Sequence, residues 1–295
     1  MKWTPGTEND DVVDERGSSG GGGGGYGGGG AMRLGGGGIA AAVVVVIVAR
    51  LFGVDISGLF GSGGSSQSSH QQSTTPHPKQ GSDSDAQLVQ FVKFVMKDVQ
   101  TTFEGMFKAE GRTYVHAKLV LFTSEIDTGC GRSSSQIGPF YCPPDEKAYI
   151  DLSFYQELRD RFGAPGEFAE AYVLAHEIGH HLQNLMGIEK RTQSLSGGKR
   201  ERNAQSVKLE LQADCFAGVW GHSANERKIV EVGDLETALN AAAAIGDDRL
   251  EKQAGIPVNA ETWTHGSSEM RMRWFKRGFE TGRFDACDTF SASSL

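Results

Sequence analysis

Apolar residues recur at helical spacing through most of the last two thirds of the chain. The first such pattern runs through Leu88, Phe91, Val92, Val95 and Val99. This spacing predicts an amphipathic helix that opens a globular domain near residue 85. Further helical patterns cover residues 166–186, 201–221, 234–245 and 268–282. We therefore expect a mainly helical domain over residues 85–290.

Two stretches alternate between apolar and polar positions and predict β-strands. They cover residues 114–122 and residues 147–154. In the first, one face carries Val115, Ala117, Leu119 and Leu121. With the helices, these strands predict an α+β fold with a small sheet. Because the second strand precedes the helix over 166–186, it could form the edge along which an extended peptide pairs.

The first 84 residues show neither the helical nor the strand spacing of apolar residues. They contain one continuous apolar run. Residues 1–38 are acidic, polar and rich in glycine. This composition predicts a disordered tail, because it cannot bury enough apolar surface to offset chain entropy. Residues 55–84 are rich in serine and glycine and predict a flexible linker.

Residues 39–49 are all apolar, and the run continues past Arg50 to residue 54. A spanning helix needs about 20 mostly apolar residues, so the run is long enough only with its flanks. The long acidic stretch before it does not resemble a signal peptide, which favours an uncleaved single-pass transmembrane anchor. A buried β-strand is the alternative. The basic residues around the run favour a cytoplasmic N-terminus and a domain on the outer, periplasmic or extracellular face.

Charge and cysteine content narrow the class of protein. The net charge is -8 and no run is rich in Lys or Arg, which argues against a nucleic-acid partner. The four cysteines include no C-x-x-C pair, so no zinc ribbon is indicated. In an oxidising compartment Cys130 could pair with Cys142, and Cys215 with Cys287. Four reduced thiols in a cytosolic enzyme are the alternative.

The candidate chemistry lies in the predicted helix over 166–186. His176 and His180 are four residues apart, so both imidazoles project from one helix face and can bind one ion. Glu177 projects beside them, where a carboxylate can take a proton from a metal-activated water and return it to a leaving amine. The pattern predicts a Zn²⁺ cofactor and metal-assisted hydrolysis.

A catalytic zinc ion needs a third protein ligand. We expect Glu210, on the next predicted helix, to supply it, and Asp214 to accept a hydrogen bond from a ligand histidine. The reverse assignment, with Asp214 as the ligand, stays open. The extended H-x-x-G-x-x-H pattern fails, because no third histidine follows His180 at that spacing. His265 could donate a hydrogen bond to an oxyanion, or it could cap the last helix at the surface.

These motifs resemble known metallopeptidases. The His176–His180 helix followed by Glu210 and Asp214 resembles the gluzincin arrangement, in which the glutamate is the third zinc ligand and the aspartate supports a histidine. The chain as a whole resembles the bacterial neutral zinc metallopeptidase family, the YpfJ-like proteins, in its glycine-rich start, its apolar run and residues 138–143, 175–181, 210–215 and 265–268. This resemblance implies a membrane-associated protein with a zincin-like domain. The segment from His265 is also similar to a histidine-to-arginine motif of HtpX-type membrane peptidases, with glycine in place of their proline.

Two classes of function fit these residues. The leading hypothesis is zinc-dependent hydrolysis of peptide bonds in a protein or peptide substrate, with Glu177 as general base and acid. The alternative is a catalytically silent, zinc-stabilised binding or scaffold domain at the membrane. Hydrolysis of a non-peptide amide or ester would use the same site.

Overall fold

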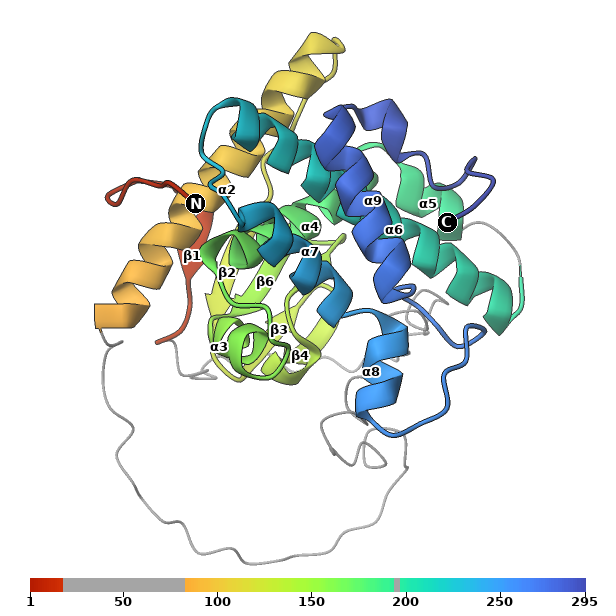
Figure 1. Ribbon diagram of the computed structural model, residues 1–295. Helices are drawn as coiled ribbons and strands as arrows, with labels where there is room; N and C mark the ends of the chain where they lie inside the picture. The colour runs from red at the N-terminus through yellow and green to blue at the C-terminus, as the bar shows by residue number, and fades with distance from the viewer. Residues whose placement is uncertain (18–82, 194–196) are drawn as a thin grey trace, which may run out of the picture.

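The computed structural model describes residues 1–17, 83–193 and 197–295 (Figure 1). The strands are β1 (Val12–Asp14), β2 (Lys118–Phe122), β3 (Glu125–Thr128), β4 (Gly131–Ser134), β5 (Phe140–Cys142) and β6 (Lys147–Asp151). The helices are α2 (Asp83–Ala109), α3 (Ser153–Asp160), α4 (Glu167–Leu185), α5 (Ile188–Gln193), α6 (Lys199–Glu226), α7 (Asp234–Ala244), α8 (Asp247–Gln253) and α9 (Ser268–Thr281). Two short 3₁₀ helices are η2 (Ser135–Ile137) and η3 (Phe284–Cys287). The prediction of a mainly helical α+β fold is confirmed.

A four-stranded sheet has the order β1-β2-β6-β5. Strands β1, β2 and β6 are parallel, and β5 is antiparallel to β6. The inner strand β2 is buried on both faces, as is usual for parallel strands covered on both sides. Leu119 and Leu121 face the main core, whereas Val120 and Phe122 face a smaller cluster near Ile126 of the β3–β4 hairpin.

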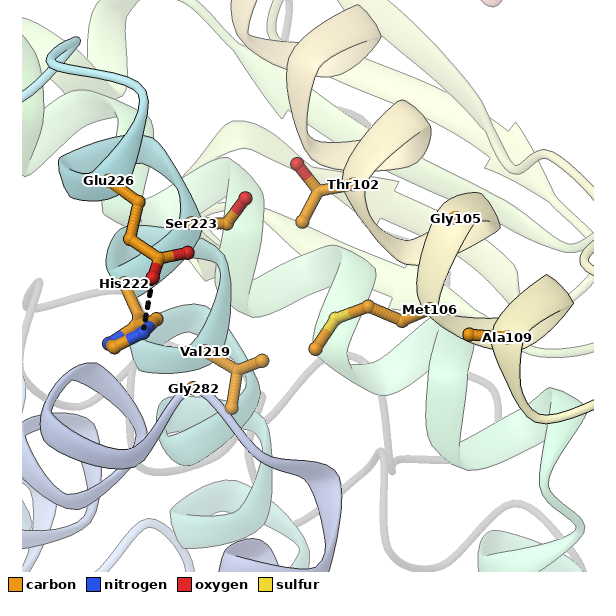
Figure 2. A pocket seen from close by; sticks show the side chains of 9 residues that line it. All are labelled: Thr102, Gly105, Met106, Ala109, Val219, His222, Ser223, Glu226 and Gly282. Atoms are coloured by element: carbon orange, nitrogen blue, oxygen red, sulfur yellow. Dashed lines mark ion pairs between the residues drawn. The ribbon is translucent and has the colours of Figure 1, made fainter.

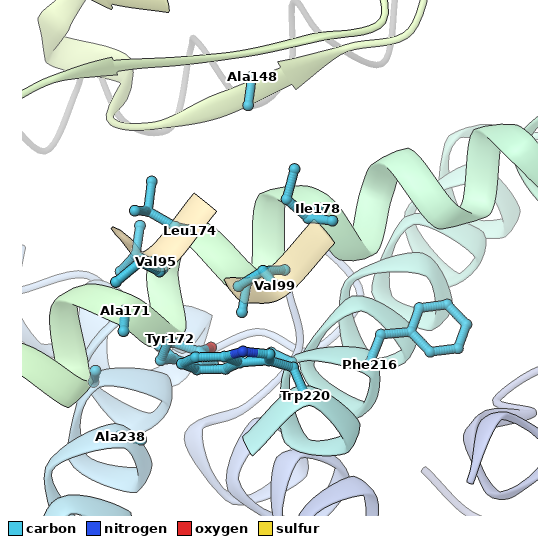
Figure 3. Close-up of a cluster of buried hydrophobic side chains, with 14 of the residues drawn as sticks. Val95, Val99, Ala148, Ala171, Tyr172, Leu174, Ile178, Phe216, Trp220 and Ala238 are labelled. Carbon is cyan, nitrogen blue, oxygen red and sulfur yellow. The ribbon is translucent and has the colours of Figure 1, made fainter. Parts of the chain in front are cut away.

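Helix α4 crosses the interior of the molecule between the sheet and the other helices. Figure 3 shows Leu174 and Ile178 on the side of α4 that faces Ala148 of β6, with Trp220 of α6 on the opposite side. Apolar contacts on both sides explain why this helix is buried along most of its length. Polar side chains on such a helix are costly unless they have partners, so those of α4 call for a specific explanation.

Helix α6 approaches both α4 and α9 closely, and α6 and α9 lie side by side (Figure 1). A Cβ atom added to Gly179 of α4 would lie 2.9 Å from Cα of Ala213 of α6, and one added to Gly278 of α9 would lie 1.9 Å from the Cys215 carbonyl oxygen. Only glycine permits these approaches. A disulfide between Cys215 and Cys287 also joins α6 to η3.

A second disulfide joins Cys130, at the tip of the β3–β4 hairpin, to Cys142 of β5. Both disulfides proposed from the sequence are therefore present. The helical patterns agree with α2, α4, α6, α7 and α9 within a few residues, except that α6 continues to Glu226 and α2 to Ala109.

The prediction of a disordered tail was wrong for residues 1–17. Val12–Asp14 form β1, and Trp3 packs against Phe91 of α2. The composition of residues 1–38 is dominated by the glycines that begin at Gly17, and this hid the apolar residues before them. The remainder of the predicted tail, the predicted anchor over 39–54 and the predicted linker up to residue 82 lie outside the described residues. Within the described part of the chain, no helix is both long and apolar enough to cross a membrane.

The two predicted strands also need correction. The first begins only at Lys118, and Val115 is 48% exposed rather than part of a buried face. The second ends at Asp151 and is an inner strand, so the prediction that it forms the free edge of the sheet was wrong. The outer strand next to it is β5, which follows the β3–β4 hairpin in the chain and pairs in antiparallel fashion with β6.

Candidate metal centre

Donor atoms of three residues from α4 and α6 converge on one point. His176 Nε2 lies 3.2 Å from His180 Nε2 and 3.2 Å from Glu210 Oε2, and His180 Nε2 lies 3.6 Å from Glu210 Oε1. Donor atoms about 2.0–2.1 Å from a tetrahedral zinc ion lie about 3.3 Å apart. The spacing of these three groups, which are the ligands named from the sequence, therefore fits zinc.

Hydrogen bonds on the far side of each imidazole leave Nε2 available for the metal. His176 Nδ1 donates to Asp214 Oδ1 at 2.8 Å, and His180 Nδ1 donates to Gln183 Oε1 at 2.9 Å. A neutral imidazole protonated at Nδ1 carries its lone pair on Nε2. Two lone pairs and the Glu210 carboxylate then face one another, and a metal ion between them, or a proton on an imidazole in its absence, makes this arrangement favourable.

Asp214 supports His176 and does not face the convergence point. It is fully buried, and Arg271 of α9 donates to both of its oxygens, from Nε at 2.8 Å and from Nη2 at 2.9 Å. The hydroxyl of Tyr172 donates to Oδ1 as well. Burial alone would raise the pKa of Asp214, but Arg271 and His176 outweigh it and keep the pKa below its usual value. Asp214 is therefore an ionised, fully hydrogen-bonded partner for His176.

Gln183 links the second histidine to α6. Its Oε1 accepts from His180, while its Nε2 donates to the Leu209 carbonyl oxygen at 2.6 Å and to Gln212 Oε1 at 3.2 Å. Leu209 immediately precedes Glu210 in the chain. One amide side chain thus fixes the orientation of His180 relative to the helix that carries the third donor.

The pKa values of the two glutamates of the site, Glu210 and Glu177, are shifted in opposite directions. Burial would raise the pKa of Glu210, but the imidazoles of His180 and His176 outweigh it and hold the pKa well below its usual value. Burial lowers the pKa of His180, but Glu210 outweighs it and raises this pKa to about 10. At Glu177, burial raises the pKa more than the two imidazoles lower it. An ionised Glu210 suits a metal ligand, whereas a Glu177 closer to neutrality suits proton transfer.

A loop wrapped around Asp247 holds His265. Oδ2 of Asp247 accepts from the backbone nitrogens of Thr264, His265 and Gly266 at 2.8, 2.7 and 3.0 Å, and Oδ1 lies 3.0 Å from His265 Nδ1. Only 18% of the His265 side chain is exposed, and Ser267 caps α9 instead. Burial lowers the pKa of His265, but Asp247 outweighs it and raises the pKa. His265 also lies close enough to Glu210 for its charge to help lower the pKa of that carboxyl.

Sequence reasoning missed four partners of the site: Tyr172, Gln183, Asp247 and Arg271. Tyr172 and Gln183 carried a local signal, because they lie one helical turn before His176 and one helical turn after His180, and Arg271 ends the histidine-to-arginine segment that begins at His265. His181, the other histidine of α4, is not part of the convergence. Its Nε2 donates to the Val115 carbonyl oxygen and its Nδ1 accepts from the hydroxyl of Tyr141.

Two other features of the described residues do not belong to this site. Cys130 and Cys142 lie near Asp145, but the disulfide between them removes the thiolates that a metal would need. Figure 2 shows a surface pocket of about 310 Å³ between α2 and α6, where His222 and Glu226 form an ion pair at 3.6 Å. None of the metal-centre residues lines this pocket.

Comparison with known proteins agrees with the geometry. The sequence pattern of the family described as "Putative neutral zinc metallopeptidase" matches residues 1–290. The uncharacterized protein YpfJ of Escherichia coli K12 is 45% identical over 248 residues, which are 83% of this chain and 84% of YpfJ. The uncharacterized protein Mb2605 of Mycobacterium bovis is 40% identical over 263 residues, which are 84% of this chain and 86% of Mb2605. No solved structure matches the chain. The chain belongs to the neutral zinc metallopeptidase family, whose cofactor is Zn²⁺.

Proposed function

We propose that this protein hydrolyses peptide bonds, with zinc held by His176, His180 and Glu210 and with Glu177 as general base and acid. The observation that carries the proposal is the convergence of the two Nε2 atoms, 3.2 Å apart, with the Glu210 carboxylate, whose oxygens lie 3.2 Å from His176 Nε2 and 3.6 Å from His180 Nε2; this spacing would suit three protein ligands of one zinc ion. A zinc ion in this position supplies Lewis acidity, which makes a water molecule acidic and polarises a carbonyl oxygen.

Proton transfer falls to Glu177. Its side chain follows His176 directly on α4 and is almost completely buried. Because burial raises the pKa of this carboxyl, it takes up and releases a proton more readily near neutral pH than an exposed glutamate does. Glu177 takes the proton of the attacking water and then delivers it to the leaving amine.

His265 supports the negative charge that develops on the carbonyl oxygen. Asp247 accepts from Nδ1 and raises the pKa of the imidazole, which favours the form with a second N–H at Nε2. A donor held by four contacts to one buried carboxylate needs little reorganisation during the reaction. Asp247 is therefore a positioning residue for His265.

The free edge of β5 lies beside the metal helix and suits an extended substrate. Tyr141 of β5 donates its hydroxyl hydrogen to His181 Nδ1 at 2.9 Å and accepts from Asn184 Nδ2 at 3.1 Å, and both partners lie on α4. An extended peptide can add to such an edge by backbone hydrogen bonds. We assign this role to β5 in place of the strand over 147–154.

The test compares the whole chain with two site variants and one control variant by zinc analysis and by cleavage of a casein-type substrate. We expect about one zinc ion per chain both in the parent and in Glu177→Gln. The parent should cleave the substrate, and Glu177→Gln should not. His176→Ala should lose both zinc and cleavage. Glu236→Gln, an exposed change on α7, is the matched control and should resemble the parent. Cleavage retained by Glu177→Gln would contradict the role of Glu177. A zinc-loaded parent that cleaves nothing would favour the scaffold alternative.

A further inference from the structure

Residues 1–17 are built into the peptidase domain. Strand β1 pairs in parallel with β2, and the Leu119 N–H donates to the Asp11 carbonyl oxygen at 2.7 Å. At the other end of the strand the Glu15 N–H donates to the Leu121 carbonyl oxygen at 2.9 Å. These bonds form a continuous ladder, so the start of the chain is the outer strand of the same sheet that packs against α4 (Figure 1).

Side chains before β1 reach two helices. Trp3 packs edge-on against Phe91 of α2, with ring centroids 5.5 Å apart. Its Nε1 donates to the carboxylate of Glu167, the first residue of the metal helix α4, at 2.9 Å. Asn9 Nδ2 donates to the Lys93 carbonyl oxygen at 3.1 Å. The segment therefore follows α2 and also contacts the helix that carries the metal ligands.

A partly buried polar cluster depends on this segment. The Asp11 carboxylate accepts from Gln100 Nε2 at 2.9 Å and from Lys118 Nζ at 2.8 Å, and it lies 2.7 Å from His116 Nδ1. Gln100 has no exposed surface. A buried amide that loses its partner costs about 1–3 kcal/mol. The remaining domain is thus shaped to receive Asp11.

This arrangement constrains membrane topology. Paired strands lie about 4.8 Å apart, whereas the hydrocarbon core of a bilayer is about 30 Å thick. We propose that residues 1–17 and 83–295 fold as one domain on one side of any membrane that the chain meets. A single-pass anchor over residues 39–54 would separate β1 from β2, so it does not fit. Two crossings need about 40 mostly apolar residues, many more than that run supplies.

The test uses zero-length carbodiimide cross-linking of full-length protein in membranes prepared without detergent. Among the ion pairs that join the segment to the rest of the domain, two link a carboxylate of the segment to a lysine: Glu8 with Lys93 at 3.6 Å, and Asp11 with Lys118 at 2.8 Å. The pair Lys276–Glu280, also 3.6 Å apart, lies within α9 and is the internal control. We expect mass spectrometry of the digested protein to recover all three amide-linked pairs.

Glu8→Gln is the matched variant, since it should remove the Glu8–Lys93 link and leave the other two. The proposal would be overturned if the control link were recovered and both links to the N-terminal segment were missing. The outcome is independent of catalysis, because an inactive scaffold with this fold gives the same three links.

Discussion

At the scale of single residues, the two histidines of the metal centre differ in their supporting partners. His176 donates to a carboxylate that Arg271 neutralises, whereas His180 donates to the neutral amide of Gln183. We predict that Gln183→Leu lowers zinc affinity about 10- to 100-fold, because the His180 imidazole loses the bond that sets its tautomer and orientation. Competition with a chelator of known affinity measures the loss. Gln253→Leu, an exposed change at the end of α8, should leave the affinity as in the parent. Equal affinities in the two variants would show that Gln183 does not position His180.

A second residue-scale prediction concerns pH. Burial would raise the pKa of Asp11, but Lys118 and His116 outweigh it and lower the pKa below 3.8. A carboxyl with a lowered pKa in the folded state adds stability above its ordinary pKa and loses it as the pH falls through the lowered value. Asp11→Asn should therefore reduce the Tm at about pH 7, and the gap to the parent should narrow as the pH falls below 3.8. A gap that stays constant down to about pH 3 would argue against this ion cluster.

Residue-level prediction from sequence succeeds where two groups share one helix. The relative placement of His176 and His180, and of Glu210 and Asp214, follows from the four-residue period of α4 and α6. Arg271 reaches Asp214 from another helix. No local period in the chain encodes such a contact, so its role emerges only from the packing of α9 on α6.

At the scale of elements, the sequence predicts helices better than strands for a similar reason. The long helices repeat their apolar period over several turns, whereas β1 and β5 are three residues each. Such short strands owe their conformation to hydrogen bonds with β2 and β6 and carry almost no pattern of their own. This is why the sequence predicts an edge strand over residues 147–154, whereas Lys147–Asp151 form the inner strand β6.

One element-scale prediction follows from the contact between α4 and α6. Gly179→Ala places a Cβ 2.9 Å from both Cα and the carbonyl oxygen of Ala213, so the two helices must move apart. Overpacking of this kind costs about 1–3 kcal/mol. We expect a lower Tm together with weaker zinc binding, because the helices that separate carry the donor atoms.

Gly105→Ala, within α2, is the matched control for that change. A Cβ there meets no heavy atom within 4 Å apart from the adjoining backbone of its own helix, so the substitution should stabilise the helix by roughly 0.5–1 kcal/mol and leave zinc binding unchanged. If both alanine variants bound zinc as the parent does, the close approach at Gly179 would have no part in forming the metal centre.

At the scale of the whole molecule, segments distant in sequence close on the helices in the middle of the chain. The N-terminal segment reaches α2 and α4 through Trp3, and the C-terminal segment is attached to α6 by the disulfide between Cys215 and Cys287. The Cys287 carbonyl oxygen also accepts from Gln212 Nε2 at 2.9 Å, two residues from Asp214. The frame around the metal centre is therefore completed by parts of the chain that carry none of its ligands.

The two disulfides should contribute unequally to this frame. Cys215 and Cys287 are 72 residues apart, and Cys130 and Cys142 are 12 apart. The loss of chain entropy in the unfolded state predicts about 4 kcal/mol of stabilisation for the longer loop and about 3 kcal/mol for the shorter one. We expect the Cys215→Ser, Cys287→Ser double variant to lose more unfolding free energy in urea than the Cys130→Ser, Cys142→Ser variant. It should also bind zinc more weakly, because Cys215 follows the partner of His176 on α6. The reverse order of stability would mean that the hairpin disulfide, and not the link from α6 to the C-terminal segment, is the main covalent brace of the domain.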